Sequence, residues 1–170
     1  SGGRFPLALG VLQVLCLDIG TDLLPALALG AEPNHRDGMP PPLTGRHLFD
    51  RSVLRRSLGI LGPVEACMEI AAFLVSLLAW GWRPGDAFPT GAPLLTASGA
   101  AFTAVVMGQF ANAFACRSTV LPAWRVPLRT NRLLLAAVGS ELAVLGVFLY
   151  VPAVADLLDQ RAPSVAGFTV

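Results

Sequence analysis

The sequence contains no lysine, and all 12 of its basic residues are arginines. Charged residues occupy only 14% of its 170 positions, whereas 54% are hydrophobic and the mean hydropathy is +0.64. This charge content is too low for an ordinary soluble domain, of which about 25% is charged, so the composition indicates a membrane protein. The arginines form no basic patch interleaved with aromatic residues, and we expect no nucleic-acid partner.

Several catalytic and metal-binding classes are also excluded. The three cysteines, Cys16, Cys67 and Cys116, fall in apolar runs and form no Cys-x-x-Cys pair, which argues against disulfides and thiolate metal sites. The sequence has no glycine-rich phosphate-binding loop and no Ser/His/Asp arrangement. We therefore expect this chain to bind no cofactor and to hydrolyse no nucleotide alone. Its start, Ser1-Gly2-Gly3-Arg4, has no initiator methionine and no signal-peptide pattern, which is typical of the middle of a longer protein.

Four segments approach or exceed the roughly 20 apolar residues that a helix needs to cross a bilayer. They cover about residues 6–29, 58–82, 94–116 and 132–151. Glycine and alanine are frequent in all four, and such small residues let helices pack closely in lipid. We predict an all-α fold: a polytopic transmembrane bundle of four spans, forming one domain over residues 1–170 in the cell membrane.

Arginines are concentrated around two of the three connecting loops. The loop between the second and third spans has only Arg83, which Asp86 offsets. The positive-inside rule therefore predicts that loops 30–57 and 117–131 are cytoplasmic and that both ends of the chain lie outside. The arginines in or beside these two loops are Arg36, Arg46, Arg51, Arg55 and Arg56, and Arg117, Arg125, Arg129 and Arg132.

The first predicted span carries two carboxylates near its middle. On an α-helix, Asp18, Thr21 and Asp22 stand at i, i+3 and i+4 and share one face. An ionised carboxylate in hydrocarbon is strongly disfavoured, and no basic residue within the spans offers compensation. Gly20 and Pro25 weaken the helical ladder and free carbonyl oxygens. These oxygen ligands suit a hard cation: Na⁺, K⁺, Ca²⁺, Mg²⁺ or a proton.

Polar side chains in the other spans are candidates to complete this site. Gln109 and Asn112 also suit hydrogen bonding between helices. Glu65 is close enough to the cytoplasmic end to reach the membrane interface, so it either reaches that interface or faces the interior of the bundle. We expect Asp18, Thr21 and Asp22 to bind the cation. The further candidates are Glu69 on the second span, Gln109 and Asn112 on the third, and Glu141, beside Ser140, on the fourth.

The stretch Asp18-Ile-Gly-Thr21-Asp22-Leu-Leu-Pro25-Ala26 resembles the sixth transmembrane helix of P-type cation-transporting ATPases. The likeness is closest to the branch that contains the sodium and calcium pumps. Residues 109–117 resemble the eighth helix of this family and its cytoplasmic end, and residues 131–152 resemble the ninth. The likeness in order, spacing and topology extends over nearly the whole chain, and the resemblance therefore implies that the four spans correspond to helices six to nine of this family.

The resemblance implies roles for individual residues. Asp18 and Asp22 match carboxylates that coordinate the transported cation, and Thr21 matches a neighbouring ligand. Gln109 and Glu141 match positions near an additional site of sodium pumps. Asn112 departs from the aspartate expected there, which is at odds with a third, sodium-type site. The loop between the first two spans matches one that packs near the phosphorylation domain.

The family's catalytic Asp-Lys-Thr-Gly motif, its nucleotide domain and its fourth, fifth and tenth helices are absent from this sequence. The resemblance therefore implies a carboxy-terminal fragment of a pump, which uses Mg-ATP only as the full-length protein. Its partners would be the lipid bilayer, the remaining helices, and the phosphorylation, nucleotide and actuator domains. Two other functions stay open: a non-enzymatic membrane module that binds or stabilises a partner, and a passive carrier of cations or protons.

Overall fold

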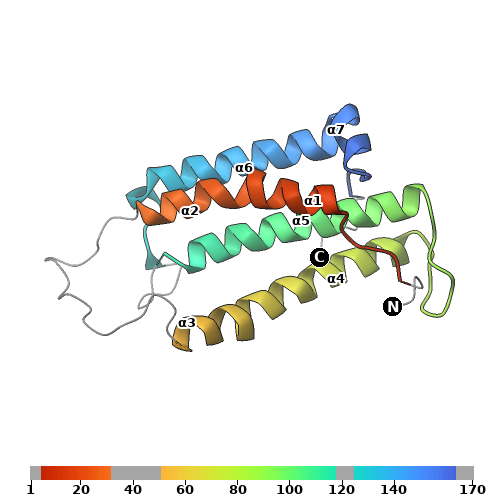
Figure 1. Cartoon of the computed structure of the whole chain (residues 1–170), viewed down its shortest axis with the longest axis horizontal. Coiled ribbons are helices and arrows are strands. Elements are labelled where there is room, and N and C mark those ends of the chain that lie inside the picture. The colour runs from red at the N-terminus through yellow and green to blue at the C-terminus, as the bar shows by residue number, and fades with distance from the viewer. Residues whose placement is uncertain (1–4, 32–50, 118–124, 164–170) are drawn as a thin grey trace, which may run out of the picture.

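The computed structural model describes residues 5–31, 51–117 and 125–163 of the chain (Figure 1). Within these residues every regular element is helical and there is no strand. Four helices are long and apolar enough to cross a membrane: Val11–Gly30, Val53–Ala79, Ala92–Ala115 and Arg132–Tyr150. The prediction of an all-α bundle with four membrane spans is confirmed. Residues 32–50, with Arg36 and Arg46, and residues 118–124 of the predicted loops lie outside the described residues.

Each of the first two long helices consists of three consecutive pieces. The first comprises α1 (Val11–Leu17), the π-helical turn η1 (Asp18–Asp22) and α2 (Leu23–Gly30). The second comprises α3 (Arg51–Arg56), the π-helical turn η2 (Ser57–Leu61) and α4 (Gly62–Ala79). The other long helices are α5 (Ala92–Ala115) and α6 (Arg132–Tyr150). A 3₁₀ turn, η4 (Leu128–Thr130), precedes α6, and the short helix α7 (Pro152–Leu157) follows it.

A proline shortly after each π-helical turn explains why the helix widens there. Pro25 and Pro63 have no N–H group, so in an α-helix the carbonyls of Thr21 and Gly59, four residues earlier, would lack their usual donor. A π-helical turn replaces the i to i+4 bonds by i to i+5 bonds over one turn. The loosened ladder expected around Gly20 and Pro25 therefore takes the form of a single π-helical turn.

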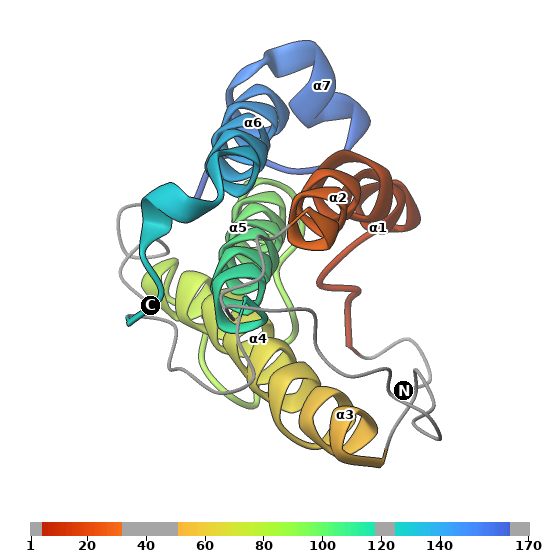
Figure 2. The same ribbon diagram turned by 90° about the vertical axis from the view of Figure 1, so that its left-hand side faces the viewer.

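The central helix of the bundle is α5. Viewed along the bundle in Figure 2, it lies between α4 on one side and α2 with α6 on the other. Of its most apolar stretch 67% is buried, against 11% to 28% for the other three spans. It contributes to all three apolar clusters of the described residues, for example through Phe102, Ala113 and Ala97. Residues on α5 are therefore placed to contact the polar groups of every other span.

The described arginines beside the two predicted cytoplasmic loops gather at one end of the bundle, where α3 begins, α5 ends and α6 begins (Figure 1). Arg56 donates through Nη2 to the carbonyl oxygen of Ala115, the last residue of α5, at 3.0 Å. Arg117 donates to the carbonyl oxygen of Pro127 at 3.1 Å and to Oγ1 of Thr130 at 2.7 Å. Cationic side chains at the end of a helix satisfy its last carbonyls and complement its dipole.

Candidate cation site

The π-helical turn η1 carries the three side chains expected to bind a cation. Thr21 is fully buried, and its Oγ1 lies 2.6 Å from the carbonyl oxygen of Leu17 and 2.9 Å from Oε1 of Gln109 on α5, so it donates to one of them at a time. Asp18 and Asp22 are exposed on the same turn. The three residues therefore do not lie on one face of the helix, although the sequence predicted that they would. The hydroxyl packs against α5, while the two carboxylates lie on the uncovered side of the turn.

Asp22 lies in a field of negative charge. Its carboxylate is close enough to those of Asp18, Glu65 and Glu141 for their charges to interact. These groups come from η1, α4 and α6, which are distant from one another in the sequence. Like charges repel strongly where water is scarce, and a cation placed among them lowers that repulsion.

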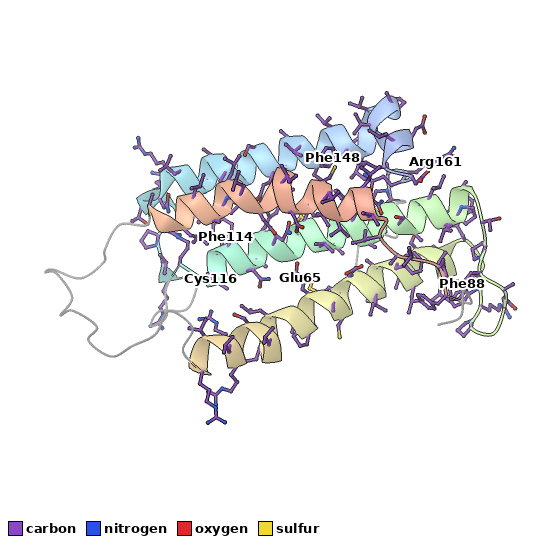
Figure 3. The ribbon with its side chains drawn as sticks, viewed as in Figure 1. Glu65, Phe88, Phe114, Cys116, Phe148 and Arg161 are labelled. Carbon is purple, nitrogen blue, oxygen red and sulfur yellow. The ribbon has the colours of Figure 1, made fainter. Side chains whose placement is uncertain are left out.

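Two amide side chains of α5 point toward its neighbours. Gln109 contacts Thr21, and Nδ2 of Asn112 donates to Oε2 of Glu65 on α4 at 2.9 Å. In Figure 3, Glu65 extends from α4 toward α5. Gly108 lets the helices approach closely here, because a Cβ at this position would lie 3.2 Å from Cγ of Glu65. Both amides thus make the hydrogen bonds between helices that the sequence offers as an alternative to cation binding.

The sequence made Glu69 a candidate ligand and left open whether Glu65 reaches the membrane interface or the bundle interior, and the structure connects Glu65 to α5. The signal that could have found Glu65 is the i, i+4 spacing of Gly108 and Asn112. This spacing puts an open position and an amide donor on one face of α5. Glu69 is half-buried one turn farther along α4 and interacts electrostatically with Glu65.

Glu141 on α6 is buried without a hydrogen-bond partner among the described residues. Its side chain is 1% exposed, and neither carboxylate oxygen accepts a hydrogen bond. The neighbouring Ser140 does not help, because its hydroxyl donates to the carbonyl oxygen of Ala137 in the same helix at 2.7 Å. A buried carboxylate without a partner is strongly disfavoured unless it takes up a proton or meets a cation. The space between Glu141 and Asp22 is therefore one in which positive charge would be stabilised.

Of the further candidates, Gln109 contacts Thr21 and Glu141 is close enough to Asp22 for their charges to interact, but the expected residues do not enclose a cation. Across residues 5–31, 51–117 and 125–163, no three His, Cys, Asp or Glu side chains come close enough together to hold a metal ion. The open side of the site is the one on which Asp18 and Asp22 are exposed. Further ligands on that side would have to come from outside the described residues.

Sequence comparison places the same region in a protein family. Residues 6–170 match the family described as "Cation transporting ATPase, C-terminus". Calcium-transporting ATPase type 2C member 2 of Mus musculus is 33% identical over 152 residues, which cover 88% of this chain and 15% of that protein. Sodium/potassium-transporting ATPase subunit alpha-4 of Homo sapiens is 32% identical over 84 residues, covering 48% and 8%. Subunit alpha-B of the Artemia franciscana enzyme is 31% identical over 87 residues, covering 49% and 9%. The chain thus spans at most 15% of the length of these relatives.

Proposed function

Because the chain belongs to the cation-transporting ATPases, as a multi-pass membrane domain from their carboxy-terminal region, we propose that it supplies part of the intramembrane cation site of an ATP-driven pump. Asp18, Thr21 and Asp22 bind the transported cation. The observation that carries the proposal is the exposed pair of carboxylates on a widened helical turn, next to the buried carboxylate of Glu141.

Binding follows from charge and coordination. A cation that leaves water exchanges its hydration shell for the carboxylate oxygens of Asp18 and Asp22 and for carbonyl oxygens of the widened turn. Pro25 favours this arrangement, because it cannot donate a hydrogen bond to the carbonyl of Thr21. The remaining helices of the pump cover the side on which both carboxylates are exposed. This chain therefore contributes one half of the site.

The other polar residues around η1 have supporting roles. Glu141 adds negative charge from α6, and Gln109 offers its Oε1 as a ligand when Thr21 turns its hydroxyl to Leu17 instead. Asn112 and Glu69 are further contributors, and Glu65 joins them through its hydrogen bond with Asn112. In this proposal the pump is of the branch that contains the calcium and sodium/potassium pumps, which is supported by matches to both kinds of relative.

The loops 30–57 and 117–131 are cytoplasmic in this proposal. The gathering of their described arginines at one end of the bundle supports this orientation. The phosphorylation, nucleotide and actuator domains of the complete pump would hydrolyse Mg-ATP on that side. Phosphorylation there changes the side to which the cation site opens, through movement of the helices.

The test is Asp22→Asn in the complete pump that contains this chain. ATP hydrolysis is measured against increasing Ca²⁺ and, separately, against Na⁺ in the presence of K⁺. We expect activation to require at least about 100-fold more of the activating cation, because a carboxylate ligand of a buried charge is lost. The matched control is Asp156→Asn, at an exposed position of α7, which should leave activation unchanged.

An unchanged cation requirement in Asp22→Asn would refute the assignment of the site. The two other functions give different results. A passive carrier would move cations into lipid vesicles without ATP. For a non-enzymatic module, the complete reading frame that encodes this chain would lack the phosphorylation motif, and no partner chain would carry that motif.

A further inference from the structure

A buried polar cluster joins three helices near the end of the bundle opposite the arginines of the two predicted cytoplasmic loops. Gln13 on α1 is 1% exposed, and its Nε2 donates to Oγ of Ser98 on α5 at 2.9 Å and to Oε1 of Gln160 at 2.8 Å. Gln160 follows α7 and is also 1% exposed, and its Nε2 donates to the carbonyl oxygen of Phe148 on α6 at 3.2 Å. The Gln13 cluster (Gln13, Ser98 and Gln160) thus connects α1, α5 and α6 through side chains.

The backbone next to Gln160 is fixed against α5. The N–H of Arg161 donates to the carbonyl oxygen of Leu95 at 3.0 Å. The carbonyl group of Arg161 lies against Gly99, where an added Cβ would overlap the carbonyl oxygen and lie 3.0 Å from the carbonyl carbon. Figure 3 shows Arg161 at this end of the bundle. Gln160 is therefore a rigid acceptor for Gln13, because the strap (residues 159–163) that carries it packs directly on the central helix.

Gln13 lies on the buried face of the first helix, the face that also carries Thr21 of the candidate site. Gln13, Leu17 and Thr21 follow one another at intervals of four residues, and all three are buried. This is the face through which Thr21 contacts Gln109. Gln13 also precedes Asp18 by five residues, which is about 7.5 Å along a helix axis. A change in how Gln13 is held therefore reaches η1 through little more than one helical turn.

The other end of the same helix is fixed by a second amide. Nδ2 of Asn131, just before α6, donates to the carbonyl oxygen of Ala28 near the end of α2 at 2.8 Å. Its Oδ1 accepts from the N–H of Leu134 at 2.9 Å and caps α6. With α1 fixed at one end and α2 at the other, a displacement of either end must be taken up by η1 between them.

We propose that Gln13 is a positioning residue of the cation site. Through Ser98 and Gln160 it sets the rotation and depth of η1 against α5, and thereby the placement of Asp18 and Asp22. This role rests on the function proposed above. It assigns a part in cation binding to a residue that contacts no cation.

The test is Gln13→Leu in the complete pump, which removes the amide and keeps a side chain of similar length. We expect the Ca²⁺ or Na⁺ concentration for half-maximal activation of ATP hydrolysis to rise about tenfold, with the maximal rate within about twofold of wild type. Ser98→Ala and Gln160→Leu should raise it less. The double variant Gln13→Leu/Gln160→Leu should raise it by less than the two single variants predict together, because both remove the bond between Gln13 and Gln160. Thr103→Val is the matched control, since it removes a buried hydroxyl that bonds the carbonyl of Gly99 in its own helix.

An unchanged half-maximal concentration in Gln13→Leu would overturn the positioning role, as would a loss of maximal rate alone. If Gln13→Leu fails to fold, Ser98→Ala decides by the same criterion. Asp22→Asn, measured in parallel, separates the two proposals. If Asp22→Asn abolishes activation and the cluster variants do not change it, only the role of Gln13 is wrong. If Asp22→Asn has no effect, the proposed cation site itself is wrong.

Discussion

Replacing Gly99 by alanine should destabilise the bundle, because the strap packs on the backbone of this residue. A Cβ at position 99 would overlap the carbonyl oxygen of Arg161 and lie 3.0 Å from its carbonyl carbon. Carbon atoms in favourable contact are about 3.5–4.0 Å apart, so the strap must move away from α5. The group in the way is backbone, which cannot move aside as a flexible side chain would.

The size of the effect follows from three contributions. Overpacking of a well-packed interior costs about 1–3 kcal/mol. Moving the strap also lengthens the 3.0 Å hydrogen bond from Arg161 to Leu95, whose loss costs about 0.5–1.5 kcal/mol. Alanine gains about 1 kcal/mol over glycine in a helix interior. The expected net destabilisation is about 0.5–3.5 kcal/mol.

The assay is thermal unfolding of the complete protein in detergent, with Gly139→Ala as the matched control. Position 139 is exposed on α6, and an added Cβ there would meet nothing within 4 Å. The control should therefore be as stable as wild type or more stable by up to about 1 kcal/mol. If Gly99→Ala melts at or above the temperature of the control, the close packing of the strap on α5 is refuted.

Three further predictions use the same unfolding assay. Glu141→Leu should stabilise the cation-free protein by about 1–3 kcal/mol, because it removes a buried carboxylate without a hydrogen-bond partner; equal or lower stability would contradict this. Asn112→Leu should destabilise by about 1–3 kcal/mol, because it leaves Glu65 without its donor. Adding Glu65→Leu should restore part of that loss, and a purely additive double variant would show that the pair does not interact. Asn131→Ala should destabilise by about 1–3 kcal/mol through loss of the α6 cap and of the hydrogen bond to Ala28; an unchanged melting temperature would argue against a connection between α2 and α6.

The fold could be predicted because its main signal is composition. Four apolar stretches separated by polar loops leave few arrangements other than a helical membrane bundle, and the described residues contain those four helices. The candidate site could be located for a similar reason. Two carboxylates are conspicuous in an apolar stretch, whatever the packing around them.

The arrangement of the site could not be predicted, because it depends on the local backbone and on contacts between distant residues. An ideal helix places Thr21 on the face of Asp18 and Asp22, but the π-helical turn leaves the hydroxyl buried and both carboxylates exposed. Asn112 bonds Glu65 because Gly108 brings α4 close to α5. Helix periodicity in a single span carries no information about which helix packs against it.

The Gln13 cluster was even less predictable from the sequence than the arrangement of the cation site. Gln13 and Gln160 are 147 positions apart in the chain, and neither belongs to a recognisable motif. The side chain of Gln13 is also uncharged, so it is less conspicuous in an apolar span than Asp18 or Asp22. Its role emerges only when α1, α5 and the strap are placed side by side.

The widened turn at η1 also sets the rotation of α2 relative to α1. A turn closed from i to i+5 contains one residue more than a turn closed from i to i+4, so it accommodates one extra residue without turning the helix that follows. If the turn closed from i to i+4 with every residue retained, α2 would rotate by about 100° relative to α1. Pro25 and Ala28, now buried, would then turn away from their neighbours. Deleting one residue between Asp18 and Asp22 should instead remove the widened turn and leave the buried face of α2 in place.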